Sequence, residues 1–197
     1  MCIRDRAEME LSMDELDYKS RGQWLSAAVS PRPLALISTR NGERENIAPI
    51  TSVSVVSNTP PLVVMSLSQT RDGMKRDTYL NLKENGECEI QFLAANIEAA
   101  KDADLAGKPV EHSEWDLLES DGPIHPMAVF VLRCKLVEDN PLPEGAVARL
   151  LILKVESIIV PSYLPNEDGY SLLCQHGLDR LTPSPQDWGH IATHHRS

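Results

Sequence analysis

Residues 34–57 read LALISTRNGERENIAPITSVSVVS, two apolar and β-branched runs on either side of an Asn-Gly pair. The first run, Leu34–Thr39, has the composition of a strand. Asn41-Gly42 is the strongest short hairpin signal in the chain, because both residue types accept the positive φ angles of a two-residue turn. Asn46–Ser57 then returns as a second strand, rich in Val and Ser. This stretch predicts an antiparallel β-hairpin.

Three short helices are predicted around the strands. The first covers residues 16–29 and is expected to end before two prolines that cannot continue it. The second covers 78–85, with Asp77 as its N-cap and Gly86 just beyond its last turn. The third lies in the Ala-rich segment bracketed by Asn96 and Gly107.

The predicted strands outnumber these helices and mostly follow one another through hairpins. Besides the two strands of the opening hairpin, they are expected over 62–67, 87–93, 127–137 and 147–160. From Pro161 onward, Pro, Gly and polar residues predict an irregular tail. About six antiparallel strands with peripheral helices indicate a mainly β protein, a closed or partly open barrel rather than a parallel βαβ sheet.

Composition bounds the class of protein. The chain has 197 residues with 19 Lys+Arg against 29 Asp+Glu, a net charge of −10. Such an acidic balance argues against nucleic-acid and anionic-membrane binding, and no apolar stretch approaches the ~20 residues of a membrane span. The four cysteines form no C-x-x-C pair, which favours reduced thiols and a cytoplasmic location.

The length suits one domain. We expect residues 1–11 to be a non-native or disordered segment, because Met1–Arg6 reads like a translated sequencing adaptor. The globular domain is then expected over 12–182, followed by an irregular C-terminal tail over 183–197.

Common catalytic and nucleotide-binding motifs are absent from the sequence. It contains no G-x-G-x-x-G, no G-x-x-x-x-G-K-[ST], no G-x-S-x-G and no H-E-x-x-H. The tail does carry His190, His194 and His195, for which a solvated tail is favoured over a metal site because no apolar periodicity would hold the ligands rigidly.

Hydroxyl side chains concentrate around one predicted strand and the next, at Thr51, Ser52, Ser54, Ser57, Ser66 and Ser68. Because side chains alternate along a strand, Ser52 and Ser54 should share one face and Thr51 and Val53 the other. Two interpretations stay open: a face of hydrogen-bond donors for a ligand, or the solvated side of an antiparallel sheet.

A local basic cluster of Arg71, Lys75 and Arg76 precedes the helix start at Asp77-Thr78. A helix N-terminus offers free N–H groups, and an Arg can hold two phosphate oxygens, so this segment suits a phosphomonoester. Asp77 would repel a phosphate and is better used as the cap. For Arg71 or Lys75 alone, pairing with Asp72 in an exposed loop is the alternative.

Several linked motifs resemble one known family. They are Ser30–Thr39, Asn46–Pro49, Val56–Val63 and Arg76-Asp77-Thr78 with Asn81. In order and spacing they resemble the flavin reductase-like, FMN-binding split-barrel family from about Tyr18 to Val160.

The resemblance implies an antiparallel Greek-key split β-barrel, a homodimer, and FMN held near the dimer interface. Members pass a hydride from NADH or NADPH to flavin, and either release reduced flavin to a partner oxygenase or keep it bound. The implied cofactor-binding residues are Thr51, Ser52, Val53, Ser54, Ser66, Leu67, Arg76, Asp77 and Thr78. Of these, we expect Ser52 and Ser54 to face the ligand with their side chains and Thr51 with its backbone.

Some positions depart from the family pattern. Arg76 replaces the usual Lys, Ile50 stands where an aromatic residue is usual, and Ser54 where Asn is usual. The G-D-H nicotinamide motif is absent, and only Asp179–Thr182 corresponds to the Arg-Leu-Gly-Gly-like segment. No catalytic side chain is expected, since the cofactor carries out hydride transfer. The alternatives are a non-catalytic FMN-binding electron carrier and a barrel oxidase acting on a phosphorylated vitamin.

Overall fold

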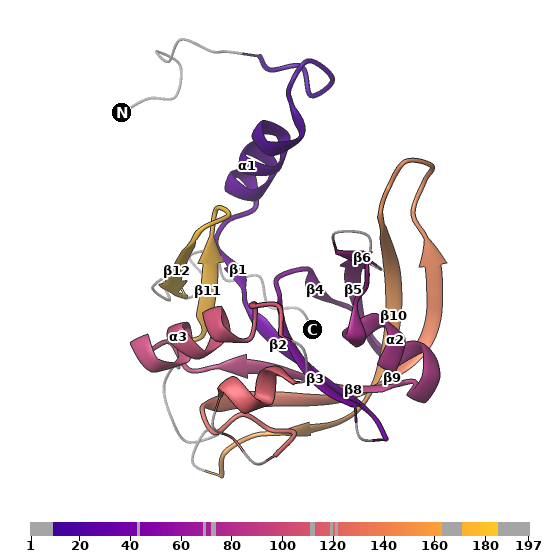
Figure 1. Ribbon diagram of the computed structural model, residues 1–197, viewed down its shortest axis with the longest axis vertical. Helices are drawn as coiled ribbons and strands as arrows, with labels where there is room; N and C mark the ends of the chain where they lie inside the picture. The colour runs from indigo at the N-terminus through magenta and orange to yellow at the C-terminus, as the bar shows by residue number, and fades with distance from the viewer. Residues whose placement is uncertain are drawn as a thin grey trace, which may run out of the picture.

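A seven-stranded antiparallel sheet forms the body of the molecule (Figure 1). The computed structural model describes residues 10–42, 44–68, 70–71, 74–110, 113–118, 120, 122–162 and 171–184. The strand order is β3-β2-β8-β9-β10-β5-β4. The strands are β2 (Ala35–Asn41), β3 (Arg44–Ile50), β4 (Val53–Asn58), β5 (Pro61–Ser68), β8 (Glu87–Leu93), β9 (Ala128–Pro141) and β10 (Ala148–Ile159).

The two edge strands of this sheet are consecutive in the chain. β3 ends at Ile50 and β4 begins at Val53, so only Thr51 and Ser52 separate them. Such a link spans about 11 Å at most, because an extended chain rises ~3.6 Å per residue. The sheet must therefore curl until its first and last strands meet, which makes it a split barrel.

This arrangement corrects the prediction of one strand over Asn46–Ser57. Its first half pairs with β2, from Asn41↔Arg44 to Ala35↔Ile50, which confirms the hairpin, although Asn41 is the last residue of β2 rather than part of the turn. Its second half pairs instead with β5. Strand-forming residues lie on both sides of Pro49, which is itself part of β3 opposite Leu36, so the local pattern does not show where the chain leaves one sheet edge for the other.

Three short α-helices are confirmed close to their predicted bounds: α1 (Tyr18–Ala28), α2 (Asp77–Asn85) and α3 (Ile97–Leu105). The Asp17 side chain caps α1 and the Asn96 side chain caps α3. Gly86 ends α2 in the left-handed conformation at φ 77°. A 3₁₀ helix, η2 (Glu114–Leu117), was not predicted.

The predicted N-cap of α2 is wrong by one residue. Arg76 is the N-cap, with an extended backbone, and Asp77 is the first helical residue. The Arg76 carbonyl already accepts from the amides of Tyr79 and Leu80, at 3.1 and 3.0 Å. Within the described residues, no side-chain hydrogen bond caps this helix start.

Two apolar clusters fill the interior. One lies among the strands and is built around Ile37, Met65 and Leu153. The other joins the outer side of the sheet to α3 and η2 through Leu36, Ala103 and Trp115, among others. Cys88, Cys134 and Cys174 are buried free thiols, as predicted for these three.

The expected irregular tail contains a hairpin. β11 (Leu173–His176) and β12 (Arg180–Pro183) pair with each other, and β11 also pairs with β1 (Arg32–Pro33). The prediction missed these strands because the β1 partner lies far upstream in the chain, with Arg32 opposite Gln175. A second small hairpin consists of β6 (Thr70–Arg71) and β7 (Met74–Lys75).

Helix α1 stands away from the barrel, as does the tip of the β9–β10 hairpin (Figure 1). Among the described helices, none is long and apolar enough to cross a bilayer. His190, His194 and His195 lie outside the described residues.

Candidate functional site

Among the described residues, the first turn of α2 is well suited to hold an anion. The leading N–H groups of a helix have no intrahelical partner and lie at the positive end of its dipole. Arg76 precedes this turn, and no described side chain caps it. The backbone of Arg71 and Lys75 lies in the small hairpin just before the helix, but their side chains are outside the described part of the structure.

Thr78, a predicted phosphate ligand, has its side chain turned toward the barrel wall. Thr78 is 2% exposed, and its Oγ1 lies 2.7 Å from the side-chain amide of Asn46, which is 4% exposed. With the amide oriented to satisfy every neighbour, Thr78 donates to Asn46 Oδ1, and Asn46 Nδ2 donates to Glu114 Oε2 at 3.1 Å. The Thr78 hydroxyl therefore holds the helix to the barrel.

The same face of α2 makes further polar contacts with β2. Asn81 Nδ2 donates to Thr39 Oγ1 at 3.2 Å, and Asn85 Nδ2 donates to the Arg40 carbonyl at 2.9 Å. Positions 78, 81 and 85 follow the three- and four-residue spacing of one helix face. Thr78, one of the three predicted phosphate residues, thus serves to dock α2 together with Asn81 and Asn85.

Glu114 belongs to this contact from the η2 side. Its Oε2 accepts from the Ile47 amide at 3.4 Å. Burial raises the pKa of Glu114, and the nearby Asp77 carboxylate raises it further. Glu114 was not among the predicted site residues, because a Glu in a polar segment carries no local sign of burial.

A neighbouring side of α2 is tied to the long β9–β10 hairpin. Tyr79 Oη and Lys83 Nζ both contact Asp139 Oδ2, at 3.0 and 2.9 Å, and Arg149 Nε also donates to this carboxylate. Burial opposes ionisation of Asp139, but the hydrogen bonds from Arg149, Lys83 and Tyr79 outweigh it and lower its pKa. In the sequence, only the four-residue spacing of Tyr79 and Lys83 could have indicated that both residues contact the same group.

The hydroxyl-rich residues lie at the closure of the barrel. Ser52 is exposed, and its Oγ donates to the Ser66 carbonyl at 2.6 Å, which links the β3–β4 connection to β5. Ser54 is exposed on the edge strand β4. Val53 is half-buried against the core, whereas Leu67 is buried in it and can reach a ligand only through its backbone.

Thr51 lines a cavity of about 430 Å³ between the end of β3, α3 and the β11–β12 hairpin. Its walls include Leu34, Pro49 and Leu181, with Lys108 also on its lining. Along β3, Thr51 is five residues beyond Asn46, the partner of Thr78. At ~3.3 Å per residue the two points are about 16 Å apart, a separation that suits the two ends of a mononucleotide-sized ligand.

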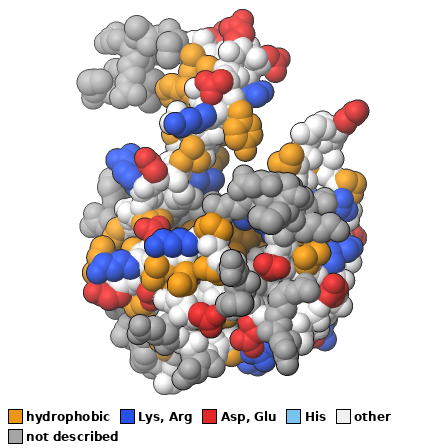
Figure 2. Space-filling view, viewed as in Figure 1, with side chains coloured by type: hydrophobic (Ala, Val, Ile, Leu, Met, Phe, Trp, Pro, Cys, Tyr) orange, Lys and Arg blue, Asp and Glu red, His pale blue; other side chains and the backbone are white. Residues whose placement is uncertain are grey.

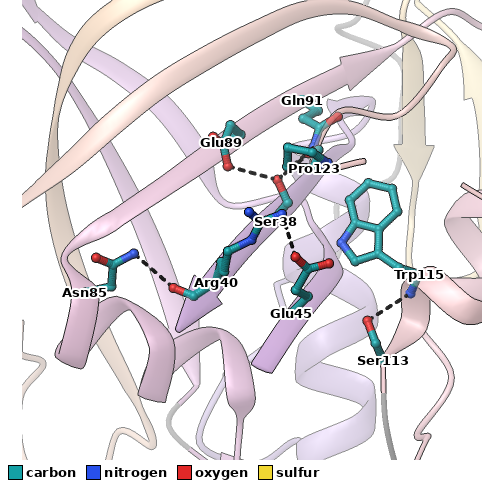
Figure 3. A network of polar contacts seen from close by, with 9 residues as sticks. All are labelled: Ser38, Arg40, Glu45, Asn85, Glu89, Gln91, Ser113, Trp115 and Pro123. Carbon is teal, nitrogen blue, oxygen red and sulfur yellow. Dashed lines mark hydrogen bonds and ion pairs between the residues drawn. The ribbon is translucent and has the colours of Figure 1, made fainter. Parts of the chain in front are cut away.

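A second, polar pocket of about 200 Å³ lies against β2 and β8 (Figure 3). Beside it Gln91 donates to Ser38 Oγ at 2.8 Å and to the Pro123 carbonyl at 2.7 Å. Gln91 Oε1 accepts from the His125 amide at 2.7 Å, and His125 Nε2 lies 3.1 Å from Asp102. Burial lowers the pKa of His125, although Asp102 opposes this. These bonds fasten the loop before β9 to the barrel.

Apolar side chains are exposed on α1, which projects from the barrel (Figure 2). Tyr18 is 84% exposed and Leu25 59%. On the edge strand β4, Val55 and Val56 are also exposed. Such side chains on a projecting helix and on a sheet edge offer surface for another chain to cover.

Comparison with known proteins agrees with the resemblance seen in the motifs. Residues 27–179 match the model of the flavin reductase like domain. The chain is 41% identical over 75 residues to the uncharacterized protein YwrF of Bacillus subtilis. The aligned region covers 38% of this chain and 36% of that protein. The chain spans half or less of the length of the curated relatives it matches.

Two solved structures share the fold over almost the whole chain. Nitrilotriacetate monooxygenase component B from Bacillus cereus has a TM-score of 0.79 at 21% identity, over 94% of this chain and 100% of that one. An FMN-binding protein from Thermus thermophilus, with bound 1-cyclohex-2-enone, has a TM-score of 0.69 at 17% identity, over 94% and 97%. At these identities the similarity establishes the split-barrel fold.

Proposed function

Because this chain belongs to the flavin reductase like domain family, we propose that it is an FMN-binding flavin oxidoreductase that transfers a hydride from NADH or NADPH to flavin. The observation that carries the proposal is the first turn of α2. It follows Arg76, has no described side-chain cap and is docked on the barrel by Thr78 and Asn81. A rigid, uncapped helix start beside a guanidinium suits a phosphomonoester.

The FMN phosphate is assigned to the Arg76 guanidinium and to the backbone N–H groups at the start of α2. Thr78 contributes through its N–H, because its hydroxyl contacts Asn46. Asp77 is exposed at this turn and repels the phosphate, so its contribution is also through the backbone. The ring system is assigned to the barrel closure, where Thr51, Ser52, Val53, Ser54, Ser66 and Leu67 lie.

When bound, the flavin supplies the hydride chemistry, and the chain supplies position and electrostatics. The Ser54 hydroxyl and the backbone N–H groups at Ser52 and Ser54 would stabilise negative charge on the polar edge of the reduced ring. Ser52 keeps acceptor capacity while it donates to Ser66, since a hydroxyl has two lone pairs. No side chain is assigned an acid or base role.

The same proposal includes the oligomeric state, a protein partner, the type of flavin and the cellular location. We assign a homodimer, because the exposed apolar residues of α1 and β4 offer surface that a second copy would cover. A partner oxygenase is supported by the name of the Bacillus cereus protein, a monooxygenase component. FMN is favoured over FAD by the similarity to the Thermus thermophilus FMN-binding protein. A cytoplasmic location fits the reduced thiols.

An FMN-binding electron carrier on the same barrel is the second candidate. It is favoured by the absence of the G-D-H nicotinamide motif from the sequence. Steady-state oxidation of NADH and of NADPH by the purified chain with added FMN separates the two. Catalytic turnover with either donor supports the reductase, whereas flavin bound without turnover supports the carrier.

The phosphate assignment has its own test. Arg76→Ala should weaken FMN binding about 10- to 100-fold, because a charged hydrogen-bonding partner contributes on the order of 1.5–3 kcal/mol. Riboflavin, which has no phosphate, should bind almost as before. Fluorescence quenching titrations measure both, and an equal loss for the two ligands would remove Arg76 from the site.

A further inference from the structure

Asp139 connects three elements of the fold through one carboxylate. It lies on β9 with its side chain 8% exposed, and it contacts Lys83 and Tyr79 of α2 and Arg149 of β10. Arg149 also donates from Nη2 to the Asp139 carbonyl at 2.9 Å. Hydrogen bonds between ionised groups are shorter and stronger than neutral ones, so this contact resists displacement.

The contact acts on the first turn of α2. Tyr79 is the third residue of the helix and directly follows Thr78, while Lys83 lies one turn later. Thr78 and Asn81 hold a neighbouring face of the helix to β3 and β2. A helix tied on two faces can neither rotate about its axis nor slide along it, which fixes the direction of its leading N–H groups.

We propose that Asp139 is a positioning residue that aims the first turn of α2 at the phosphate of the bound flavin. The inference rests on the proposed function, which places that phosphate at Arg76 and the helix start. Asp139 itself does not touch the ligand in this assignment. It acts through the Tyr79 hydroxyl and the Lys83 ammonium, and so maintains a prearranged set of donors.

Charge and position predict opposite effects when Asp139 is neutralised. As a negative charge near an anion site, Asp139 repels phosphate, and its removal alone would strengthen FMN binding. As a positioning group, its removal would let the helix start shift and would weaken FMN binding. The direction of the change in affinity therefore distinguishes the two roles.

The experiment compares Asp139→Asn with Glu138→Gln in the full chain, freed of flavin. Glu138 directly precedes Asp139 on β9 and its side chain is exposed. The control therefore removes one negative charge without changing a contact to α2. FMN and riboflavin affinities are measured by fluorescence quenching, and thermal unfolding checks the fold. We expect Asp139→Asn to weaken FMN about tenfold, with riboflavin within about twofold of wild type and the control unchanged.

Other outcomes overturn the inference. Stronger or unchanged FMN binding in Asp139→Asn would show that Asp139 does not position the helix, and an equal loss for both flavins would show general damage to the barrel. If Asp139→Asn does not fold, Tyr79→Phe removes one of the two contacts between Asp139 and α2, leaves the Lys83 contact and every charge in place, and should weaken FMN binding selectively. A wild-type chain that does not prefer FMN to riboflavin would instead refute the phosphate assignment itself.

Discussion

Two regions of this molecule are rich in short polar side chains, and they are used in opposite ways. The first, the buried polar belt, consists of Ser38, Thr39, Asn46, Thr78, Asn81, Gln91 and His125, each less than 5% exposed. The second, the edge strand β4 with its two preceding residues, places Ser52 and Ser54 at the exposed surface. The belt holds elements together, whereas the edge leaves hydroxyl groups available to a ligand.

The difference shows that the residue type alone does not identify a binding site. A buried polar group must find a partner, because leaving it unsatisfied costs about 1–3 kcal/mol. Thr78 meets this demand through Asn46, even though its position in the sequence suggested a ligand. Ser54 is exposed, so water can meet the same demand there.

Breaking the belt should have the largest effect on stability. Asn46→Ala removes the partner of the buried Thr78 hydroxyl and leaves Glu114 with only its longer hydrogen bond from the Ile47 amide. We expect the free energy of unfolding to fall by about 2–3 kcal/mol. Urea denaturation of the flavin-free chain measures this, and a loss below about 0.5 kcal/mol would contradict the role assigned to the belt.

The pH dependence of the free energy of unfolding tests another residue of the buried polar belt, His125. Because burial lowers the pKa of His125 below its usual 6.5, the unfolded chain binds a proton first as the pH falls. Stability is therefore complete above about pH 6.5 and decreases below it, with a slope of at most about 1.4 kcal/mol per pH unit from this group. His125→Asn should remove that part of the slope, as urea midpoints between pH 5 and 8 would show. A variant with the wild-type slope would exclude His125 as its origin.

Substitutions beside the edge strand β4 should change flavin binding more than the free energy of unfolding. Ser52→Ala removes the bond to the Ser66 carbonyl, which contributes about 1 kcal/mol at most at an exposed site. It should also lower flavin affinity or shift the reduction potential. Ser57→Ala is the matched control, since Ser57 Oγ accepts from the nearby Thr59 amide at 3.2 Å. Binding isotherms measure the affinity, and a redox titration measures the reduction potential. If Ser57→Ala changes either one and Ser52→Ala changes neither, the assignment of which strand residues face the flavin is wrong.

Ser54→Ala should have the smallest effect on folding. An exposed hydroxyl with a solvated environment contributes little, so the free energy of unfolding should stay within about 0.5 kcal/mol of wild type. If Ser54 faces the flavin as proposed, affinity falls while stability does not. Unchanged affinity would restrict the ligand contacts of this strand to Ser52 and the backbone.

Local patterns in the sequence were sufficient for the three α-helices and for several of the long strands. The β2–β3 hairpin that Asn41-Gly42 signalled, the start of α3 after Asn96 and the end of α2 at Gly86 depend on residues within a few positions of one another. Strand β8 matched its predicted bounds of Glu87–Leu93 for the same reason. The linked motifs also indicate the family on their own, because their spacing records which elements follow which.

Tertiary structure alone decided how those elements meet. Asn46–Ser57 divides between opposite sheet edges because curling of the whole sheet brings those edges together, and no residue in the segment encodes that closure. The β11–β12 hairpin forms where β1 provides an edge for it. The Asn46–Thr78 bond of the belt joins residues 32 positions apart, and the Tyr79–Asp139 bond joins residues 60 positions apart. Propensity and periodicity act over a few residues, whereas burial and hydrogen-bond pairing are set by the packed fold, so the roles of Thr78 and Asp139 emerged only there.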